Sequence, residues 1–349
     1  MNTFFARLHF VLSEISTRAF LPVDGEAELL VAHLELENAE SVPGVGVRTY
    51  EEFPGDIPPE LWMLRTCSGR RVAIDRLDGS LLEDARSESD RLDLVDHARP
   101  ERVRKQPEEI ALIREATTFA DMVLTRLLAE GPSIVRGGGT EAELMADCAD
   151  HARTHLLGEH GDAFAGTKCG ITASVHSGPR AALPHGAVTS RRPQPGDPII
   201  AGIGCSLGGY HAESGVTLVV GQPTRAQLDV MSAMADATAA TVSALERGAP
   251  CAEVDRAARD VLRSAGLGES LRHRIGHGMG IEGHEAPWLS PGDATPVEPG
   301  MVFSCEPGVY RPGLDGWRTI DTLIVGPEGV EVASSFLSHH PPERRVLAV

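Results

Sequence analysis

The feature that most constrains how this chain folds is a long apolar stretch interrupted by a pair of glycines. Residues 198–220 read PIIAGIGCSLGGYHAESGVTLVV, with Gly208 and Gly209 near the middle. Adjacent glycines accept the positive φ angles of a tight hairpin turn, so the pattern predicts a strand on each side of the turn. The strands that we expect lie at 198–205, 209–220, 301–306 and 320–325.

Amphipathic helices separate the predicted strands. One begins at Pro107, and its apolar stripe runs to Gly131, which we expect to stop the helix. Two more helices begin with capping boxes, and another amphipathic segment follows them. These helices are marked by Thr140 with Glu143, by Thr224 with Gln227, and by residues 251–266. Such a mixture predicts an α+β fold with a largely antiparallel sheet.

The first hundred residues differ from the rest. They contain short apolar runs separated by glycine, proline and charged residues, which predict short strands. A charged, apolar-poor segment at 86–106 predicts a linker or a connecting helix. We therefore expect a small mixed α/β N-terminal domain over residues 1–100 and a larger domain over residues 101–349.

Charge and hydrophobicity limit the partners of the protein. The 32 Lys and Arg residues against 50 Asp and Glu give a net charge of −18, which argues against nucleic acid because phosphate binding needs a basic surface. No stretch approaches the roughly 20 apolar residues that cross a bilayer. Arg7, His9 and Glu14 interrupt the apolar start of the chain, which makes it a poor signal peptide. The six cysteines lack CxxC spacing and are expected to be reduced. We expect a soluble, cytoplasmic protein without a membrane partner.

Candidate functional groups occur in four islands of the sequence. A lone His or Glu is more often a surface or core residue than a catalytic one, so no island is decisive by itself. Together they form a set of ionisable groups of the kind that marks active sites. The islands are ALPHG with His185, GGYHAE with His211 and Glu213, GHGMGIEGHEAP with His277 and His284, and SCEPG with Glu306.

The order of these islands resembles that of the creatinase/aminopeptidase superfamily, which has the "pita-bread" fold. The matching strings include SGPRAALPHGAVTSRRPQPGD, HRIGHGMGIEGHEAPWLSPGD, VEPGMVFSCEPGVY and GWRTIDTLIV, and the resemblance covers roughly residues 105–335. It implies a pita-bread catalytic domain at 101–349. The first hundred residues resemble only loosely the smaller N-terminal domain of creatinases and prolidases, and they look shortened.

The resemblance also implies where metal ligands would stand. Metallopeptidases of the superfamily hold two metal ions with two Asp, one His and two Glu. Carried onto this sequence, these positions fall on Gly202, Glu213, His277, Glu306 and Ile320. Glycine and isoleucine offer no oxygen to a cation. A dinuclear site of the family type is therefore not expected.

Two kinds of active site remain open. In the first, Glu213, His277 and Glu306 hold one divalent ion such as Mn, Co or Zn, because three protein ligands plus water are common in catalytic sites. In the second, no metal is present. The resemblance to creatinase then implies that Glu213 and Glu306 bind a cationic substrate, that His185 is the acid/base, and that His277 and His284 position the scissile group.

We favour the metal-independent hypothesis, in which a creatinase-like hydrolase cleaves a C–N bond of a small, cationic or amidine-like substrate. The same histidine chemistry would also serve an elimination or an isomerisation. The alternatives are a mononuclear metal-dependent Xaa-Pro dipeptidase or aminopeptidase and a non-catalytic binding protein. The resemblance further implies a homodimer.

Two more residues are candidates for substrate binding. His211 precedes Glu213 by two positions on a predicted strand, so both side chains are expected on one face. Arg318 in GWRT is expected either to pair with Asp321 or to anchor a substrate carboxylate.

Overall fold

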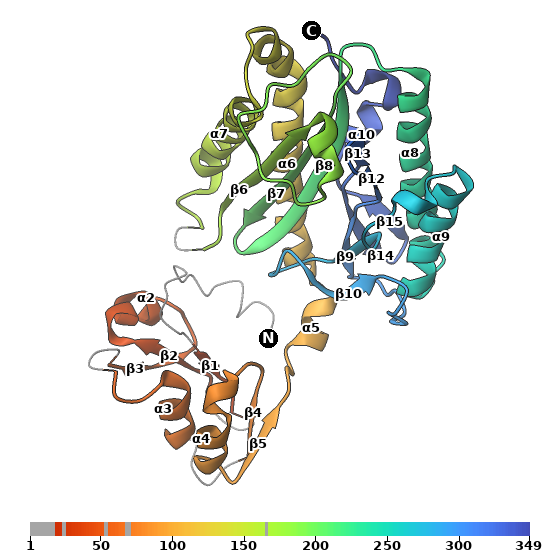
Figure 1. Ribbon diagram of the computed structural model, residues 1–349. Helices are drawn as coiled ribbons and strands as arrows, with labels where there is room; N and C mark the ends of the chain where they lie inside the picture. The colour runs from red at the N-terminus through yellow and green to blue at the C-terminus, as the bar shows by residue number, and fades with distance from the viewer. Residues whose placement is uncertain (1–17, 23–25, 52–54, 67–70, 165–166) are drawn as a thin grey trace. The chain divides into compact units, whose positions relative to one another are not determined.

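The structure is a computed structural model, and it describes residues 18–22, 26–51, 55–66, 71–164 and 167–349. The chain divides into two compact units, Met1–Glu101 and Arg102–Val349 (Figure 1). The apolar segment at the start of the chain lies outside the described residues. Within them, no helix has the length and apolar character needed to cross a membrane; cytoplasmic location stays a prediction.

The first unit contains two small sheets with helices. Strand β1 pairs antiparallel with β2, and β2 pairs parallel with β3. Strands β4 and β5 form a second, parallel pair. Strand β5 lies inside the segment that was predicted to be a linker or a helix, so that prediction missed it. The strands are β1 (Arg18–Phe20), β2 (Glu28–Ala32), β3 (Gly46–Tyr50), β4 (Arg71–Ile74) and β5 (Arg91–Leu94). The helices are α2 (Leu36–Glu40), α3 (Pro59–Thr66), α4 (Leu82–Ser87) and α5 (Arg99–Val103).

The predicted hairpin is the centre of the first sheet of the second unit. Strands β7 and β8 pair antiparallel from Pro198 opposite Val219 to Leu207 opposite Tyr210. Gly208 and Gly209 turn the chain with φ of 58° and 87°. The sheet order is β16-β8-β7-β6. Its strands are β6 (Gly170–Ser177), β7 (Pro198–Leu207), β8 (Tyr210–Val220) and β16 (Val346–Leu347).

The C-terminal part of the unit forms a second sheet, with strand order β10-β9-β11-β14-β15, and a separate β12–β13 hairpin. The two sheets meet at a bridge between Gly215 and Ile320, whose backbone groups exchange two hydrogen bonds of 2.9 Å. The strands are β9 (Gly276–Gly278), β10 (Glu285–Leu289), β11 (Val302–Cys305), β12 (Gly308–Arg311), β13 (Asp315–Arg318), β14 (Asp321–Gly326) and β15 (Gly329–Val332).

Two pairs of long helices cover these sheets (Figure 1). Helices α6 (Pro107–Arg136) and α7 (Glu141–His160) pack on strands β6, β7 and β8, whereas α8 (Arg225–Glu246) and α9 (Cys251–Ser264) pack on elements of the C-terminal half. The capping boxes predicted at Thr140 and Thr224 are both present. A short helix, α10 (Phe336–His339), follows near the C-terminus.

Helix α6 does not stop at Gly131 as predicted but continues through Pro132 to Arg136. The reason for the glycine is packing. A Cβ at position 131 would lie 3.2 Å from Leu347 Cδ2 and 3.3 Å from Leu127 Cδ1. The glycine therefore lets the C-terminal strand approach the helix closely.

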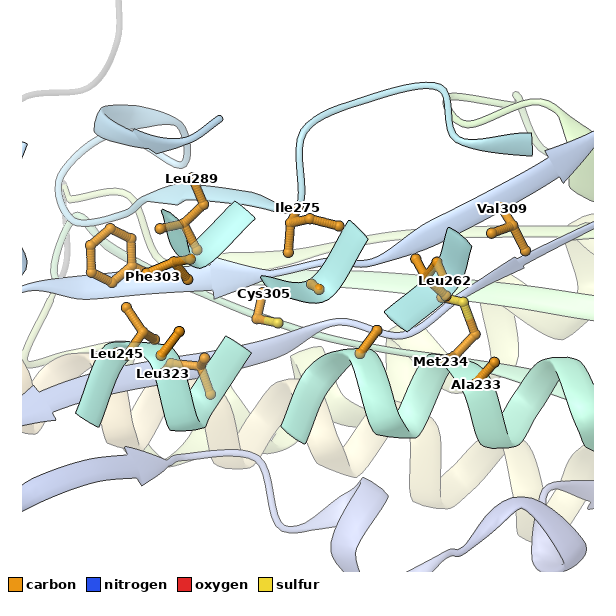
Figure 2. Packing of buried hydrophobic residues seen from close by; sticks show 14 of the residues in the cluster. Ala233, Met234, Leu245, Leu262, Ile275, Leu289, Phe303, Cys305, Val309 and Leu323 are labelled. Carbon is orange, nitrogen blue, oxygen red and sulfur yellow. The ribbon is translucent and has the colours of Figure 1, made fainter. Parts of the chain in front are cut away.

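The main core of the second unit lies between helices α8 and α9 and the second sheet (Figure 2). Leu245 and Leu262 from the helices pack with Phe303, Cys305 and Leu323 from the strands, and all five are at most 1% exposed. Burying a large apolar side chain of this kind contributes about 1.5–3 kcal/mol. This packing fixes strands β9 and β11, which carry or precede the candidate site residues.

Candidate functional site

The site lies on one face of the β7–β8 hairpin, where it meets the second sheet. Glu213 stands opposite Gly204, and His211 stands opposite Ser206. Alternate residues of a strand point to the same face, and both His211 and Glu213 are partly exposed while Ala212 between them is buried. This agrees with the expectation that His211 and Glu213 share a face.

Glu213 is fixed from the second sheet. Its backbone N–H donates to Thr322 Oγ1 at 3.0 Å, and the Thr322 hydroxyl donates back to the Glu213 carbonyl at 2.8 Å. The Ser304 hydroxyl donates to Glu213 Oε2 at 2.7 Å. The Glu213 carboxylate therefore has a defined position, and the Ser304 hydroxyl contacts only one of its two oxygens. Our sequence analysis identified neither Ser304 nor Thr322.

His277 lies on β9, and its ring is fully buried. Its Nδ1 is 3.0 Å from the Gly278 carbonyl oxygen. A carbonyl only accepts, so Nδ1 carries the proton and Nε2 presents a lone pair. Nε2 lies 3.5 Å from Glu306 Oε1 and 3.7 Å from Glu213 Oε2, without a hydrogen-bond partner among the described residues.

The glycines around His277 reflect close backbone contacts rather than a loop. A Cβ at Gly276 would lie 2.0 Å from the backbone carbonyl oxygen of Ser304. A Cβ at Gly278 would lie 2.7 Å from the backbone carbonyl oxygen of Glu285. No side chain fits at either position. Strand β9 can therefore pair with β10 and β11 on its two sides only because glycines flank the histidine.

Burial controls the charges in this cluster. It raises the pKa of Glu306 to about 7, with help from the neighbouring Glu213, and it raises the pKa of Glu213 as well. It lowers the pKa of His277 to about 3, and His284 adds to this effect. His277 is therefore neutral at pH 7, and without a cation the two carboxyl groups tend to retain a proton.

His284 and His211 lie at the edge of the cluster. The exposed His284 ring is 4.1 Å from the His277 ring, centroid to centroid, and tilted by 30°. Burial lowers the pKa of His211 to about 4, and its ring is 3.6 Å from where a Cβ at Gly283 would stand. His211 thus packs against the loop that carries His284.

His185 is on the loop that follows β6, near enough to His273 to act on its charge. It is exposed, and it does not belong to the set of possible metal ligands that contains His277. Its neighbour Pro184 accepts a 2.9 Å hydrogen bond from Arg318 Nη1, which connects the His185 loop to the site. The structure thus brings Glu213, His277, His284 and Glu306 together and leaves His185 exposed on its loop.

The two positions that lack family ligands are occupied differently. A Cβ at Gly202 would lie 2.8 Å from Arg318 Nη2, so the guanidinium fills the space in which a side chain would begin. The Ile320 side chain packs over Gly215. A Cβ added at Gly215 would lie 2.7 Å from Ile320 Cδ1. The Arg318–Asp321 ion pair that we considered does not form in the described part of the chain; the charges acting on Asp321 are those of Asp121 and Arg345.

Arg274 is a further site residue that the sequence analysis missed. Its guanidinium lies 4.6 Å from the centre of the Trp288 ring, a cation–π arrangement. Against the larger effect of burial, Arg318 and, to a smaller extent, Arg274 lower the pKa values of Glu213 and Glu306. Arg274 directly precedes the IGHGMG string, but an isolated arginine carries no sequence pattern that would mark it as a site residue.

The residues present fit one metal ion better than two. Ligand atoms of Glu213, His277 and His284 all lie within 4.8 Å of one another, and Glu306 adds a carboxylate near His277. A buried imidazole lone pair beside carboxylates is a nitrogen and oxygen set that suits a divalent ion such as Mn, Co or Zn. The Arg318 guanidinium and the Ile320 side chain leave no comparable set for a second ion.

Two helix-covered sheets that meet at an imidazole–carboxylate cluster are the arrangement of the pita-bread class of proteins, and comparison with known proteins agrees. The sequence matches Metallopeptidase family M24 over residues 111–327. The chain belongs to this family, and it is a hydrolase of C–N bonds. The prediction that the chain belongs to the creatinase/aminopeptidase superfamily is confirmed, and so is the prediction that it has the pita-bread fold.

Individual relatives are peptidases by name. The chain is similar to the probable dipeptidase PepE of Mycobacterium tuberculosis, with 33% identity over 321 residues that cover 90% of this chain and 82% of the relative. It is also similar to the Xaa-Pro dipeptidase of Pyrococcus furiosus, with 29% identity, 89% of this chain and 86% of the relative.

A solved structure of the dipeptidase PepE from Mycobacterium ulcerans superimposes with a TM-score of 0.80 and 30% identity, over 97% of this chain and 88% of that one. The names of these proteins favour the metal-dependent peptidase that we held as an alternative over the metal-independent hydrolase that we preferred.

Proposed function

We propose that this protein is a metal-dependent dipeptidase of family M24 with a single divalent ion, acting on Xaa-Pro dipeptides. The observation that carries the proposal is the Nε2 atom of His277, which is buried without a hydrogen-bond donor among the described residues and faces two carboxylates. A buried acceptor of this kind is costly unless a cation or a proton satisfies it.

Glu213, His277 and a third group, His284 or Glu306, are the residues that would hold the ion. Such an ion polarises a peptide carbonyl and makes water a better nucleophile. Ser304 orients the Glu213 carboxylate through its 2.7 Å hydrogen bond. Where His284 is the third ligand, the Glu306 carboxylate, 3.5 Å from His277 Nε2, is placed to accept a proton from the attacking water. His284 on the rim can supply a proton to the leaving nitrogen.

The test is metal removal followed by titration. Protein treated with a chelator is assayed on an Xaa-Pro dipeptide while Mn²⁺, Co²⁺ or Zn²⁺ is added back. We expect activity to disappear with the metal and to be restored fully at about one equivalent per chain, because three protein ligands are enough for one catalytic ion. Restoration that requires two equivalents contradicts the mononuclear site.

Activity that survives complete metal removal would instead support the metal-independent hydrolase. In that case His185 is the expected acid/base, and its replacement by alanine must lower turnover. Protein that binds a metal but cleaves no dipeptide would support the non-catalytic alternative. The functional roles of His185, His211 and Arg318 remain predictions until such assays are done.

The resemblance to creatinases and prolidases also supports a homodimer. Light scattering of the full chain measures this directly. A mass near twice the 37.2 kDa of one chain supports the dimer, and a mass of one chain at assay concentrations contradicts it.

A further inference from the structure

The rim residue His284 has no hydrogen bond to its ring within the described part of the chain. The ring is exposed and packs beside the His277 ring, 4.1 Å away between centroids. An exposed side chain without hydrogen bonds is placed mainly by its backbone, since several rotamers are open to it. The position of this imidazole at the site therefore depends on the backbone that carries it.

The next residue, Glu285, anchors that backbone. It is the first residue of β10, and its carboxylate is buried. Lys105 Nζ donates to Glu285 Oε1 at 2.8 Å, and Arg102 Nη2 donates to Glu285 Oε2 at 2.7 Å. The Lys105 side chain is only 2% exposed, so water and salt screen this ion pair much less than a surface pair. Each oxygen of the carboxylate is held by its own cation.

The same ion pair fixes the loop that precedes β10. A Cβ at Gly280 would lie 2.6 Å from Glu285 Oε1 and 2.7 Å from Lys105 Cε. The pair therefore lies directly against the backbone of the loop, and only glycine fits there. The Gly280 carbonyl also accepts from the backbone N–H of His211 at 2.8 Å. The loop at 280–284 is thus held by the ion pair and by strand β8.

Both cations lie on the segment with which the second unit begins. Arg102 is its first residue. The backbone N–H of Lys105 donates to the Gly300 carbonyl at 2.7 Å, and a Cβ at Gly300 would lie 3.2 Å from the Lys105 carbonyl oxygen. Helix α6 begins two residues later, at Pro107. Lys105 therefore reaches the loop from a backbone that is itself fixed on both sides, as the supporting residues of a precise site must be.

We propose that Lys105 and Glu285 are positioning residues, which hold His284 in place at the site through the backbone that precedes β10. This inference rests on the proposed dipeptidase function, in which His284 either binds the ion or supplies a proton. Displacing a reacting group by about 1 Å costs on the order of 100-fold in rate. Loss of the ion pair is therefore expected to lower kcat by about that factor.

A buried ion pair also affects stability, and two variants separate this effect from positioning. Glu285→Gln leaves the Lys105 ammonium buried without a carboxylate, so we expect a lower Tm. Lys105→Met/Glu285→Met removes both charges and keeps most of the volume, so we expect the Tm to return close to the wild-type value. On an Xaa-Pro dipeptide at saturating Mn²⁺, its kcat should remain about 100-fold lower. A double variant that regains both Tm and kcat overturns the proposal.

A double-mutant cycle measures whether the pair acts through His284. In the His284→Ala background, Lys105→Met/Glu285→Met should change kcat by less than about threefold, because the group that the pair positions is gone. The control is Arg126→Gln/Asp147→Asn, which removes a charge pair between α6 and α7. It should leave kcat unchanged in both backgrounds. A further loss of about 100-fold in His284→Ala would make the two effects independent and overturn the proposal.

Arg102→Met is a milder variant for the same cycle. It removes one of the two hydrogen bonds to Glu285, while Lys105 still balances the charge of the carboxylate. We expect kcat to fall about tenfold in the wild type, the factor for one charged hydrogen bond, and to stay unchanged in His284→Ala. An equal loss in both backgrounds contradicts the positioning role.

A measurement without catalysis separates this inference from the dipeptidase. In NMR spectra of the metal-free full chain with isotope-labelled histidine, the His284 signal is the one that His284→Ala lacks. We expect Lys105→Met/Glu285→Met to shift this signal, because the ring leaves its place beside His277, and Arg126→Gln/Asp147→Asn to leave it unchanged. A His284 signal that the double variant does not move overturns the positioning role. A moved signal in a protein that cleaves no dipeptide supports the positioning role and overturns the dipeptidase.

Discussion

His277 is held in one tautomer and one orientation by its surroundings. Its Nδ1 donates to the Gly278 carbonyl, and the flanking glycines allow strands on both sides to approach. Burial lowers its pKa to about 3, so Nε2 remains an acceptor across the physiological range. A fixed neutral imidazole is what a divalent cation requires of a histidine ligand.

Replacing this imidazole tests the cation site. We expect His277→Ala to weaken Mn²⁺ binding by at least about 100-fold, because a mononuclear site loses one of its few protein ligands. Isothermal titration of the metal-free protein measures the affinity and the stoichiometry. His155→Ala, an exposed histidine on α7, is the matched control and leaves both unchanged. Mn²⁺ binding by His277→Ala with wild-type affinity would place the ion elsewhere.

Asp321 gives the fold a pH dependence of its own. Burial raises its pKa to about 7, Asp121 adds to the rise and Arg345 opposes it. Because the folded pKa lies above the ordinary value of about 3.8, the contribution of the protonated form to stability is complete below pH 4. It is lost as the pH rises through 7.

Asp321→Asn removes this titration. Between pH 5 and pH 8 we expect the difference in unfolding free energy between the variant and the wild type to shift in favour of the variant, by on the order of 2 kcal/mol. Urea unfolding at the two pH values measures it. A parallel pH profile of the two proteins would show that Asp321 is ionised throughout. The comparison does not depend on a constant offset from the buried guanidinium of Arg345, which loses the Asp321 charge in the variant.

At the scale of elements, one buried carboxylate on α7 holds the loop that carries His185. Glu141 is fully buried. Its Oε1 accepts hydrogen bonds of 2.8 Å from the backbone and hydroxyl of Ser177, and its Oε2 accepts from the backbone and hydroxyl of Thr189 at 3.1 and 2.7 Å. The start of the connection between β6 and β7, at Ser177, and its middle, at Thr189, are thereby attached to one helix.

Glu141→Gln should release this loop. The amide nitrogen cannot accept from Ser177 or Thr189, so we expect a loss of about 2–3 kcal/mol in unfolding free energy and faster hydrogen exchange at residues 178–190. Glu143→Gln, two residues along the same helix and exposed, changes only a capping box and should cost about 1 kcal/mol or less. Equal exchange in the loop of both variants would contradict this role of Glu141.

On the scale of the whole molecule, the proposed metal site would couple metal binding to folding, because its ligands would come from both sheets of the unit Arg102–Val349. Glu213 is on β8, His277 on β9, and Glu306 directly follows β11. An unfolded chain does not hold these groups together, so an ion that binds the native site stabilises the native state.

The size of this stabilisation can be predicted. With free Mn²⁺ at about 100 times its Kd, the unfolding free energy should rise by about 2.7 kcal/mol. Denaturant unfolding of the full chain with and without the ion measures the change, and His277→Ala should remove it. Stabilisation of His277→Ala by the same concentration of Mn²⁺ would indicate binding outside the proposed site.

Local elements and the identity of most site residues could be predicted from the amino-acid sequence. Gly208 and Gly209 specified the hairpin, and Thr140 and Thr224 specified helix starts, because turns and caps depend on neighbouring residues. The histidine and glutamate islands, compared with a known superfamily, located Glu213 and His277. The missing ligands at Gly202 and Ile320 were also visible in the sequence.

Only the tertiary structure decided what replaces those ligands and how the site is held. Ser304 and Glu213 are 91 positions apart, and Arg318 meets Gly202 across a still longer separation. Asp121 accepts from Ser214 and from Ser334, 213 positions away. Periodicity and local propensity carry no information on such pairs, since the distance between them is set by how two sheets and four helices pack. For the same reason, the sequence predicted that Gly131 ends a helix, whereas in the fold Gly131 allows close packing against Leu347.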